Sequence, residues 1–559
     1  MAIQWYKEFD VIVIGSGAAG FTAAITAKKQ GLSTLLIEKT DKYGGSTALS
    51  GGAIWVPNNI YLQQAGLEDS VASAQTYLDA TVGNSSSRKV QEAYLTRGPE
   101  MVKYFKINTH MHWEYVKGYS DYYPNKPGGK PEGRSIEAKI FNLKRLKKSL
   151  PTMRRSQIPT MGMVIKSMEF YKLNMFTRTL AGFLTAMKVG FRFLRTICSF
   201  GFYKPATLGE ALIGRLMLSY KELNGELWLS TPFKEIISDG QGRVIGIIVE
   251  KDGRLLNLKA RKGVIFGSGG FSHNQQLREQ YLPKPTNAKW TLASEGQTGD
   301  LIPEAIKLGA ALKVMDKVWG TPTGIPPSAP AYMAVADRAL PGIIVVDQNG
   351  KRYVNECAPY HEFVDTMYEH NVHKGESLTI PSWYIFDKRV KSRYLVFGIM
   401  PGLSIPKTWK EAGFVKEALS IEELAAKISV PSHDLIDTIE RYNGFAISGQ
   451  DMDFGKGENP YDNFYGDPTR KNPNMAPIDK APYYAIPIYP GDIGTKGGVE
   501  IDEYGRVLTS EHKVIEGLYA AGNASASIMG NTYPGPGATI GPAMVFGYVA
   551  AKHIADSKK

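Results

Sequence analysis

Residues 9–20, FDVIVIGSGAAG, decide the fold: an apolar run rich in β-branched residues leads into three glycines spaced as GxGxxG. An alanine-rich stretch typical of a helix follows to Gln30, and a second apolar run, residues 33–37, ends at Glu38. A strand, a glycine turn, a helix and a second strand with an acid at its tip make up a βαβ unit. In this order and this close to the N-terminus, the pattern predicts a dinucleotide-binding site rather than a purely structural glycine turn.

Each residue type in this unit has a physical task. Gly15 permits the tight turn, Gly17 lets the backbone approach a pyrophosphate, and Gly20 allows the helix to pack closely on the strand. The helix N-terminus faces the anion, and Glu38 accepts a hydrogen bond from a ribose hydroxyl. The candidate nucleotide-binding residues of the unit are Gly15, Ser16, Gly17, Ala18, Ala19, Gly20, Glu38, Lys39 and Thr40.

Three further glycine-rich segments favour FAD over a nicotinamide dinucleotide. Residues 43–56, YGGSTALSGGAIWV, come just after Glu38, where a long flavin continues past the diphosphate. Residues 263–271, GVIFGSGGF, and 517–523, GLYAAGN, are apolar runs that end in glycines; either alone fits an ordinary strand end, but together they predict returns to one nucleotide site. The further candidate FAD-binding residues are Gly45, Ser46, Thr47, Ser50, Gly51, Gly52, Ser268, Gly269, Gly270, Asp300, Gly522, Asn523, Gly537, Thr539 and Ile540.

The composition is that of a large globular enzyme. The chain has 559 residues, of which 43% are hydrophobic and 21% charged, so two lobes are expected and a disordered or peptide-like role is excluded. Two cysteines, Cys198 and Cys357, are too few for a disulfide framework. No metal is expected, because none of the nine histidines forms an HxxxH or HExxH pair. The N-terminus does not have the pattern of an export signal, so a cytoplasmic location is expected.

The positive charge is confined to one segment. The formal net charge is +12, and residues 141–206 contain thirteen Lys or Arg against one acid, Glu169, so the rest of the chain is neutral. Large apolar residues alternate with these cations, which favours contact with a lipid surface, and the uncharged stretches are too short to span a bilayer. The alternative is a helical hairpin whose apolar side packs on the protein and whose cations are solvated. Nucleic acid is not expected, since no binding motif accompanies the charge.

Residues 312–486, between the second and the last of the glycine-rich segments, differ from the rest of the chain in their predicted secondary structure. Within this region, IIVVDQNGKRYV and WYIF predict strands, whereas IEELAAKI and HDLIDTIERYNGFA have helical periodicity. Residues 451–477 are polar and rich in Pro, Asn and Gly, and we expect a long surface loop. We predict an α/β fold with a discontinuous Rossmann-like FAD-binding domain, a basic apolar insertion and an α+β substrate/catalytic domain. The FAD-binding domain comprises residues 1–140, 207–311 and 487–559, the insertion 141–206, and the substrate domain 312–486.

Six motifs together carry a family resemblance. They are GSGAAG, GGSTALSGGAIWVPNN, SDYYPNKPGG, GKRYVNECAPY, YPGDIGTKGG and GLYAAGNASASIMGNTYPGPGATIG. Through them the chain resembles the 3-ketosteroid Δ1-dehydrogenases, which belong to the flavoprotein family of fumarate reductase and succinate dehydrogenase. The resemblance covers nearly the whole chain except residues 141–206. Some members join the flavin to a histidine, but GGSTALSGG has none, so the resemblance implies non-covalent FAD.

The turn at residues 533–541, YPGPGATIG, suits an oxyanion. Proline has no N–H, so this stiff turn presents the amides of Gly535 and Gly537 ahead of a helix that starts near Thr539. A helix N-terminus stabilises negative charge on a reduced flavin. The resemblance implies that the Tyr533 hydroxyl and the Gly537 N–H hold the 3-keto oxygen of a steroid and so acidify its C2 proton.

Residues 115–123 contain four tyrosines, which composition alone would assign to packing or to the surface. The resemblance implies that Tyr119 lines the substrate pocket and that Tyr122 is catalytic, with Tyr123 as the alternative if the alignment shifts by one residue. Tyr115 and Tyr332 are further candidate substrate contacts. The resemblance also assigns proton abstraction to Tyr360, which needs a lowered pKa or a hydrogen-bonded phenol to act near neutral pH. We predict that Tyr122 is that phenol.

These expectations combine into one reaction. Tyr360 removes the C2 proton of a 3-ketosteroid while C1 delivers a hydride to flavin N5. The substrates are expected to include apolar sterol ketones such as cholest-4-en-3-one, and a quinone or another acceptor reoxidises the flavin. Three alternatives stay open: a Δ4-(5α)-3-ketosteroid dehydrogenase, a fumarate-reductase-like enoate reductase, and a membrane-docked flavin-binding protein without turnover.

Overall fold

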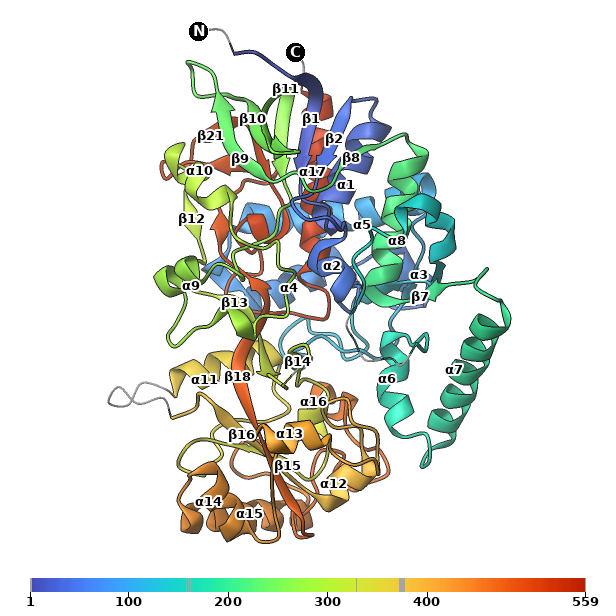
Figure 1. Ribbon diagram of the computed structural model, residues 1–559, viewed down its shortest axis with the longest axis vertical. Coiled ribbons are helices and arrows are strands. Elements are labelled where there is room, and N and C mark those ends of the chain that lie inside the picture. The colour runs from blue at the N-terminus through green and yellow to red at the C-terminus, as the bar shows by residue number, and fades with distance from the viewer. Residues whose placement is uncertain are drawn as a thin grey trace.

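The structure is a computed structural model that describes residues 3–557 except 157, 159, 161, 328 and 371–377. Figure 1 shows two lobes, one above the other, with both chain ends at the top of the upper lobe and a pair of helices standing to one side. The chain passes from the upper lobe to the lower one and returns through the long strand β18 (Tyr483–Thr495). Residues far apart in the sequence therefore meet where the lobes join.

The upper lobe contains an eight-stranded sheet built from distant pieces of the chain. Its parallel strands, in order across the sheet, are β21 (Val514–Ala520), β11 (Arg254–Phe266), β1 (Lys7–Ile14), β2 (Thr34–Ile37) and β8 (Glu226–Trp228). Three antiparallel strands complete it: β9 (Phe233–Ser238), β10 (Val244–Lys251) and β20 (Arg506–Leu508). The last four residues of β1, β11 and β21 are buried and their strands run parallel, so the glycines that follow these strands meet at one edge of the sheet.

Helix α1 (Ala18–Lys29) begins directly after the predicted glycine turn. A Cβ at Gly20 would lie only 1.7 Å from the carbonyl oxygen of Gly15, and Gly15 itself has φ +95°. No other residue allows this close approach of helix and turn. Helices α8 (Leu208–Glu222) and α17 (Ile540–Asp556) pack against α1 and complete its burial.

The other elements of the upper lobe form its loops, caps and small sheets. The α-helices are α2 (Gly45–Leu49), α3 (Ile60–Gln64), α4 (Val71–Thr81), α5 (Arg88–Asn108), α9 (Gln275–Tyr281) and α10 (Leu301–Lys307). The short strands are β3 (Ala53–Trp55), β4 (Trp113–Tyr115), β5 (Ser135–Ala138), β6 (Phe141–Asn142), β7 (Pro205–Ala206), β12 (Leu312–Lys313) and β19 (Gly498–Val499). The 3₁₀ turns are Gly83–Ser85, Leu143–Ser149, Ala288–Trp290 and Gly522–Ala524.

The lower lobe is a six-stranded sheet covered by helices. Its strands are β13 (Val318–Gly324), β14 (Tyr332–Met333), β15 (Ile343–Val346), β16 (Ser382–Asp387), β17 (Lys416–Ala418) and β18. Its helices are the 3₁₀ turn Asp337–Ala339, α11 (Tyr360–Glu369), α12 (Lys388–Arg393), α13 (Lys407–Glu411), α14 (Ile421–Ile428), α15 (Ser432–Ser448) and α16 (Pro460–Phe464). The strand predicted from WYIF and both predicted helices are confirmed as β16, α14 and α15. Of the strand predicted from IIVVDQNGKRYV, only the first four residues form one, β15, and the rest is turn and loop.

The pair of helices at the side of the molecule is α6 (Ser167–Asn174) and α7 (Leu180–Cys198), within the basic segment (Figure 1). The start of α6 is fixed to the upper lobe, because Ser167 Oγ donates to Glu137 at 2.6 Å. Its last residue, Asn174, accepts from the Leu395 N–H of the lower lobe at 2.8 Å. No helix in the described part of the chain is long and apolar enough to cross a membrane.

Candidate active site

Three tyrosines from three distant segments meet between the lobes. Tyr122 follows β4, Tyr360 is the first residue of α11, and Tyr533 lies in the loop before α17. Tyr122 Oη donates to Tyr360 Oη at 2.9 Å, and the Tyr533 ring centre lies 5.1 Å from that of Tyr122 and 5.3 Å from that of Tyr360. All three are at most 5% exposed. The structure thus brings together the phenols that the sequence singled out.

The phenols are uncharged in this arrangement. Burial raises the pKa of Tyr360 well above its ordinary value, and the hydrogen bond from Tyr122 offsets only part of that effect. Burial likewise raises the pKa of Tyr122 and of Tyr533. Of the two conditions set for Tyr360 as a base, the structure therefore meets the hydrogen-bonded partner and not the lowered pKa. Tyr123, the alternative to Tyr122, instead places its Oη 3.0 Å from His361 Nε2.

The loop that carries Tyr533 is held by its carbonyl groups. The Pro534 carbonyl accepts from Tyr77 Oη at 2.6 Å and from the Tyr122 N–H at 2.9 Å. The Pro536 carbonyl accepts from Ser135 Oγ at 2.6 Å. The surrounding protein therefore fixes the loop through the carbonyls of its two prolines. The Gly537 N–H lies within hydrogen-bond reach of the Tyr533 hydroxyl and helps to lower its pKa against the effect of burial.

Gly537 could not be replaced by a larger residue. Its φ is +92°, and a Cβ there would lie 2.4 Å from the carbonyl oxygen of Ala53. The backbone N–H of Trp55 donates to the Gly537 carbonyl at 3.1 Å. Helix α17 follows with Thr539 at its N-cap, as predicted.

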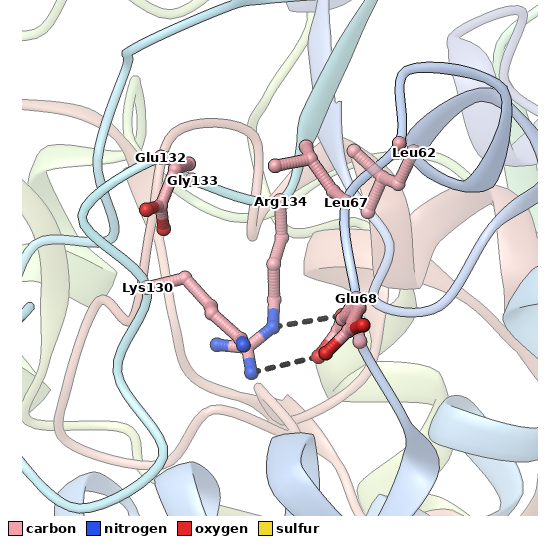
Figure 2. A pocket seen from close by; sticks show the side chains of 9 residues that line it. Leu62, Leu67, Glu68, Lys130, Glu132, Gly133 and Arg134 are labelled. Carbon is pink, nitrogen blue, oxygen red and sulfur yellow. Dashed lines mark hydrogen bonds and ion pairs between the residues drawn. The ribbon is translucent and has the colours of Figure 1, made fainter.

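A buried ion pair supports this loop from the upper lobe. Trp55 packs beside the loop that carries Tyr533, since a Cβ at Gly535 would lie 2.5 Å from its ring, and its Nε1 donates to Asp121 at 2.7 Å. The fully buried Arg134 pairs with Asp121 and, at 3.0 Å, with Asp69. Figure 2 shows Arg134 and its ion pair at the wall of a cavity of about 250 Å³. None of the predicted site residues lines that cavity, so the ion pair and not the cavity serves the site.

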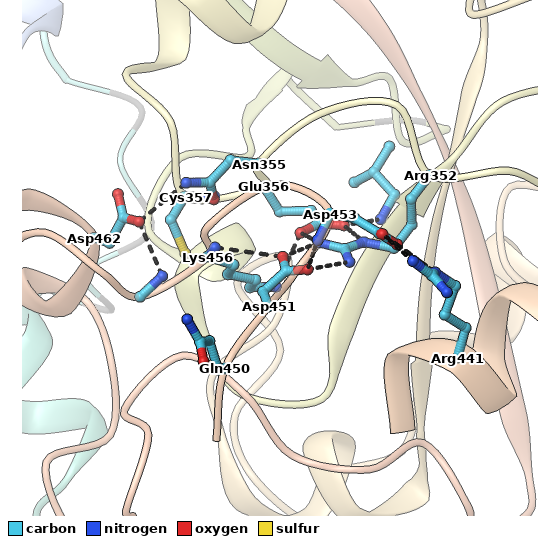
Figure 3. A network of polar contacts seen from close by, with 12 residues as sticks. Arg352, Asn355, Glu356, Cys357, Arg441, Gln450, Asp451, Asp453, Lys456 and Asp462 are labelled. Carbon is cyan, nitrogen blue, oxygen red and sulfur yellow. Dashed lines mark hydrogen bonds and ion pairs between the residues drawn. The ribbon is translucent and has the colours of Figure 1, made fainter. Parts of the chain in front are cut away.

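A second network fixes the segment that leads to Tyr360 (Figure 3). Glu356 pairs with Arg352 at 2.8 Å and with Lys456 at 3.3 Å, and Arg352 also pairs with Asp451 at 2.8 Å. Burial opposes the charge on Glu356, but Arg352 and then Lys456 outweigh it and lower its pKa to about 2. Arg338 donates to the carbonyl of Glu356 at 2.7 Å. The segment that precedes α11 is therefore fixed at Glu356 by ion pairs to its side chain and by a hydrogen bond from Arg338 to its carbonyl.

Several predicted nucleotide residues lie together at the strand ends of the large sheet. Glu38 accepts from Ser16 Oγ at 2.5 Å and from the Thr40 N–H at 3.0 Å. The Ala18 N–H donates to Thr47 Oγ1 at 3.1 Å, which joins the first glycine turn to the second. Lys39 forms an ion pair with Asp300 at 2.9 Å. The Gly52 N–H donates to Ser50 Oγ at 3.0 Å, and the Ser294 N–H donates to Ser46 Oγ at 2.8 Å.

The remaining predicted nucleotide residues surround the same strand ends. Gly269 has φ +79°, and a Cβ at Gly270 would lie 1.9 Å from Thr495 Oγ1. A small cavity of about 20 Å³ is lined by Gly522, Asn523 and Thr539 among others. Gly45 packs on Gly17, Ser268 on Gly15, and Ile540 opens α17, whereas Gly51 is exposed. This arrangement fits FAD, because closely packed glycine turns admit the diphosphate, a helix N-terminus favours its negative charge, and the acid at the tip of the second strand suits a ribose hydroxyl.

The predicted substrate contacts separate into two groups. Tyr119 belongs to the phenol cluster: its ring stacks on Phe464 at 4.5 Å, and its Oη lies 2.6 Å from Tyr465 Oη. Tyr115 donates instead to the carbonyl of Glu132. Tyr332 donates to Asp337 at 3.1 Å and stacks on Phe397 at 4.8 Å. The described contacts of Tyr115 and Tyr332 do not reach the three phenols, and their substrate role stays a prediction.

The expectation that residues 451–477 form a surface loop is wrong for part of this segment. Helix α16 lies within it, and Tyr461 is 2% exposed with its ring 4.9 Å from that of Tyr122. Sequence reasoning also missed Trp319, whose ring lies 4.8 Å from Tyr533. The aromatic cluster YDNFY at residues 461–465 was the available signal, but the surrounding Pro and Asn outweighed it.

Comparison with known proteins identifies the family. The family described as FAD binding domain matches residues 10–540. A 3-oxosteroid 1-dehydrogenase of Mycolicibacterium smegmatis is 44% identical over 98% of this chain and 97% of its own length, and one of Comamonas testosteroni is 33% identical over 97% of this chain and 96% of its own.

The chain belongs to the 3-oxosteroid 1-dehydrogenase family of FAD-binding proteins. It is an FAD-dependent oxidoreductase, as the sequence predicted. A 3-ketosteroid Δ1-dehydrogenase structure from Sterolibacterium denitrificans, in complex with 1,4-androstadiene-3,17-dione, has a TM-score of 0.93 and 41% identity over 99% of this chain and 100% of that one. The predicted α/β fold with a discontinuous Rossmann-like domain is thereby confirmed.

The network around Glu356 generates a stability prediction. Glu356→Gln leaves the buried Lys456 without its acidic partner and leaves Arg352 paired with Asp451 alone, so we expect the free energy of unfolding to fall by about 3–5 kcal/mol. The control is Glu423→Gln, whose partner Lys427 is exposed, and its cost should stay below about 1 kcal/mol. Urea unfolding of the FAD-loaded protein measures both. Equal effects of the two substitutions would contradict the prediction.

The same carboxylate also predicts a pH dependence. The pKa of Glu356 in the folded protein, about 2, is below the value of about 4.3 for an unperturbed glutamate. Its contribution to stability is therefore complete above about pH 5 and is lost as the pH falls towards about 2. We expect the difference in unfolding free energy between wild type and Glu356→Gln to shrink over that interval. A difference that stays constant down to about pH 3 would rule out this assignment.

Proposed function

We propose that the protein is a 3-ketosteroid Δ1-dehydrogenase that introduces a double bond between C1 and C2 of a 3-ketosteroid. The observation that carries the proposal is the Tyr122–Tyr360 hydrogen bond of 2.9 Å, set against Tyr533 in one buried cluster. The names of the relatives support the same reaction, and the steroid in the related crystal structure carries a double bond at C1. FAD, when bound, supplies the hydride acceptor.

Tyr533 and Gly537 hold the 3-keto oxygen in this proposal. A hydroxyl and an amide N–H that converge on one carbonyl oxygen withdraw electron density and acidify the protons on the adjacent C2. Both donors belong to one turn whose carbonyls point into the protein, so their geometry is set before substrate arrives. A flexible loop would lose this advantage, because each donor would have to be ordered during the reaction.

Tyr360 takes the C2 proton. A neutral buried phenol is a weak base, so the hydrogen bond that Tyr122 donates to its oxygen matters: it stabilises the phenolate and opposes the effect of burial on the Tyr360 pKa. Exclusion of water from the cluster strengthens every interaction with charge that develops there. Tyr122 thus acts through Tyr360 and does not receive the proton itself.

The proposal is tested by anaerobic mixing of the FAD-loaded protein with androst-4-ene-3,17-dione. We expect bleaching of the flavin absorbance and a product two hydrogens lighter with its new double bond at C1, assigned by NMR. A 5α-saturated ketosteroid that gains its double bond at C4 would instead indicate the Δ4-(5α) enzyme. Reoxidation of the reduced protein by fumarate would indicate the enoate reductase. Binding without bleaching would leave only a flavin-binding protein.

Tyr360→Phe should lower turnover by about 10²–10⁴-fold, since it removes the base and leaves the ring. FAD content should not change, because the residues assigned to FAD lie on other segments. Tyr123→Phe is the matched control: it removes a neighbouring phenol that contacts His361 and should keep most of the activity. Single-turnover reduction of the flavin measures both variants. Wild-type rates in Tyr360→Phe would defeat the assignment.

We further propose that α7 docks the enzyme on the cytoplasmic face of a membrane. One face of the helix exposes large apolar side chains over its whole length, and these side chains do not pack into the core of the molecule. They are Leu180, Phe183, Leu184, Met187, Phe191, Leu194 and Ile197, each at least 52% exposed, and the turn that follows adds Phe200 and Phe202 at 90% and 86%. Cations of the same segment would contact anionic headgroups, each worth about 1 kcal/mol near the surface.

A row of aromatic rings leads from this hairpin towards the phenols. Tyr171 on α6 lies 5.0 Å from Phe464, which stacks on Tyr119 at 4.5 Å. This apolar row supports entry of side-chain-bearing sterol ketones, such as cholest-4-en-3-one, from the lipid. A quinone dissolved in the same bilayer is the proposed electron acceptor. Anaerobic reoxidation of the reduced enzyme by a soluble quinone, but not by NAD⁺, is the expected result.

The docking proposal predicts the effect of three substitutions on lipid binding. Phe183→Glu, Met187→Glu and Phe191→Glu together should reduce cosedimentation with phosphatidylglycerol vesicles by about tenfold or more, while turnover of androst-4-ene-3,17-dione in solution stays unchanged. The control triple, Leu255→Glu, Leu419→Glu and Ile447→Glu, adds the same charge at exposed apolar sites elsewhere. Equal vesicle binding by both triple variants would refute a role of α7.

A further inference from the structure

Lys496 is a buried lysine next to the loop that carries Tyr533. It directly follows β18 and is 1% exposed. Its Nζ donates to the carbonyl oxygen of Thr532 at 2.8 Å and lies 4.7 Å from the centre of the Trp319 ring. Thr532 precedes Tyr533 in the chain, and the Trp319 ring packs on the Tyr533 ring at 4.8 Å. Lys496 therefore contacts two groups that adjoin Tyr533.

No acid neutralises this ammonium group within contact distance. Among the residues that the structure describes, no carboxylate lies within 4.0 Å of Lys496 Nζ. The similarly buried Lys456, in contrast, pairs with Glu356 at 3.3 Å. An unpaired buried cation is costly, and burial accordingly lowers the pKa of Lys496 to about 7. A buried lysine with no carboxylate in contact and a lowered pKa, next to the phenols, is a candidate for a role in the reaction.

Of the other titratable groups near Lys496, Asp365 favours the charged ammonium and opposes part of the effect of burial on the Lys496 pKa, whereas Lys317 lowers that pKa further. Lys317 is a second cation, and it pairs at 3.4 Å with Asp365, which is 32% exposed on α11. Burial, with the charges of Lys496 and Lys317, lowers the pKa of His361 well below its ordinary value, so this imidazole is neutral. Its Nδ1 has no hydrogen-bond partner in the described part of the chain. Asp365 is paired with Lys317 and partly exposed, so it neutralises Lys496 only in part and not by direct contact.

We propose that Lys496 is a positioning residue whose charge stabilises the negative charge that the steroid 3-oxygen acquires at Tyr533 and Gly537. The inference rests on the proposed function, because removal of the C2 proton creates that charge. Since no acid competes for the ammonium group at contact distance, the developing anion interacts with it in a dry, low-dielectric environment. The contacts with Thr532 and Trp319 hold the group in place before the reaction, so little reorganisation is needed.

The test uses two steroids with the FAD-loaded enzyme. Estrone has a phenolic ring A, and its ionised oxygen imitates the enolate. Androsta-1,4-diene-3,17-dione has the corresponding oxygen as a neutral ketone. Dissociation constants for both are measured from the change in flavin absorbance, and the ionised fraction of bound estrone is measured from its ultraviolet spectrum. These readouts do not depend on turnover.

Three variants separate charge from hydrogen bonding. Lys496→Gln removes the charge but keeps a donor for the Thr532 carbonyl, Lys496→Met removes both, and Lys496→Arg keeps the charge. We expect Gln and Met to lower the ionised fraction and to weaken estrone binding by about tenfold, against less than about threefold for the diketone. Arg should restore most of the preference for estrone. Turnover of the Gln variant should fall with the same trend.

Estrone phenolate that binds the Gln variant as well as it binds wild type would overturn the inference. Equal weakening of both steroids in that variant would also overturn it, because a purely structural defect does not distinguish an anion from a ketone. If the Met variant does not fold, the comparison of Gln with Arg decides the question by itself. A failure of the proposed function is recognised separately: the wild-type flavin would then not be bleached by any 3-ketosteroid.

Discussion

The hydrogen bond between Tyr122 and Tyr360 is the constraint on which the site depends, because it joins a residue of the upper lobe to a residue of the lower lobe. Neither lobe alone contains the pair. A hydrogen bond stabilises hydroxyl groups buried to this extent, so this contact favours one relative position of the lobes. A small rotation between the lobes would break this hydrogen bond and move Tyr360 away from the turn that carries Tyr533.

Rigidity on both sides of this contact comes from buried charge. Arg134 and Asp121 hold Trp55 against the turn, and Glu356 with its two cations holds the segment that ends at Tyr360. Buried ion pairs of this kind add little net stability compared with apolar packing, but they accept only a narrow range of geometries. The ion pairs matter to the site because they lie on either side of the phenols and restrict the positions of the segments that carry them.

The sequence was sufficient where local geometry dictates the structure. The turn at Gly15 and Gly20 requires glycine for steric reasons that hold in any context, so the first βαβ unit and a dinucleotide site could be predicted from residues 9–38. The choice of FAD needed the three further glycine-rich segments. The partnership of Tyr122 with Tyr360 needed the family resemblance, since 238 residues separate them. Tyr461 and Lys496 were not predicted. Tyr461 lies in a segment whose composition resembles a surface loop, and Lys496 stands out because no carboxylate of the described residues contacts it, which only coordinates reveal.

The electrostatics of the cluster impose a further condition on the reaction. Burial keeps all three phenols neutral, so in the proposed reaction the negative charge at the steroid oxygen is met by neutral donors alone unless a cation lies behind them. A carboxylate in contact with that cation would cancel the benefit, and an exposed cation would be screened by water. A buried lysine held by a carbonyl oxygen and an aromatic face meets both requirements at the cost of a lowered pKa. The same environment that makes Tyr360 a poor base at rest therefore makes a single fixed charge more effective once the proton begins to move.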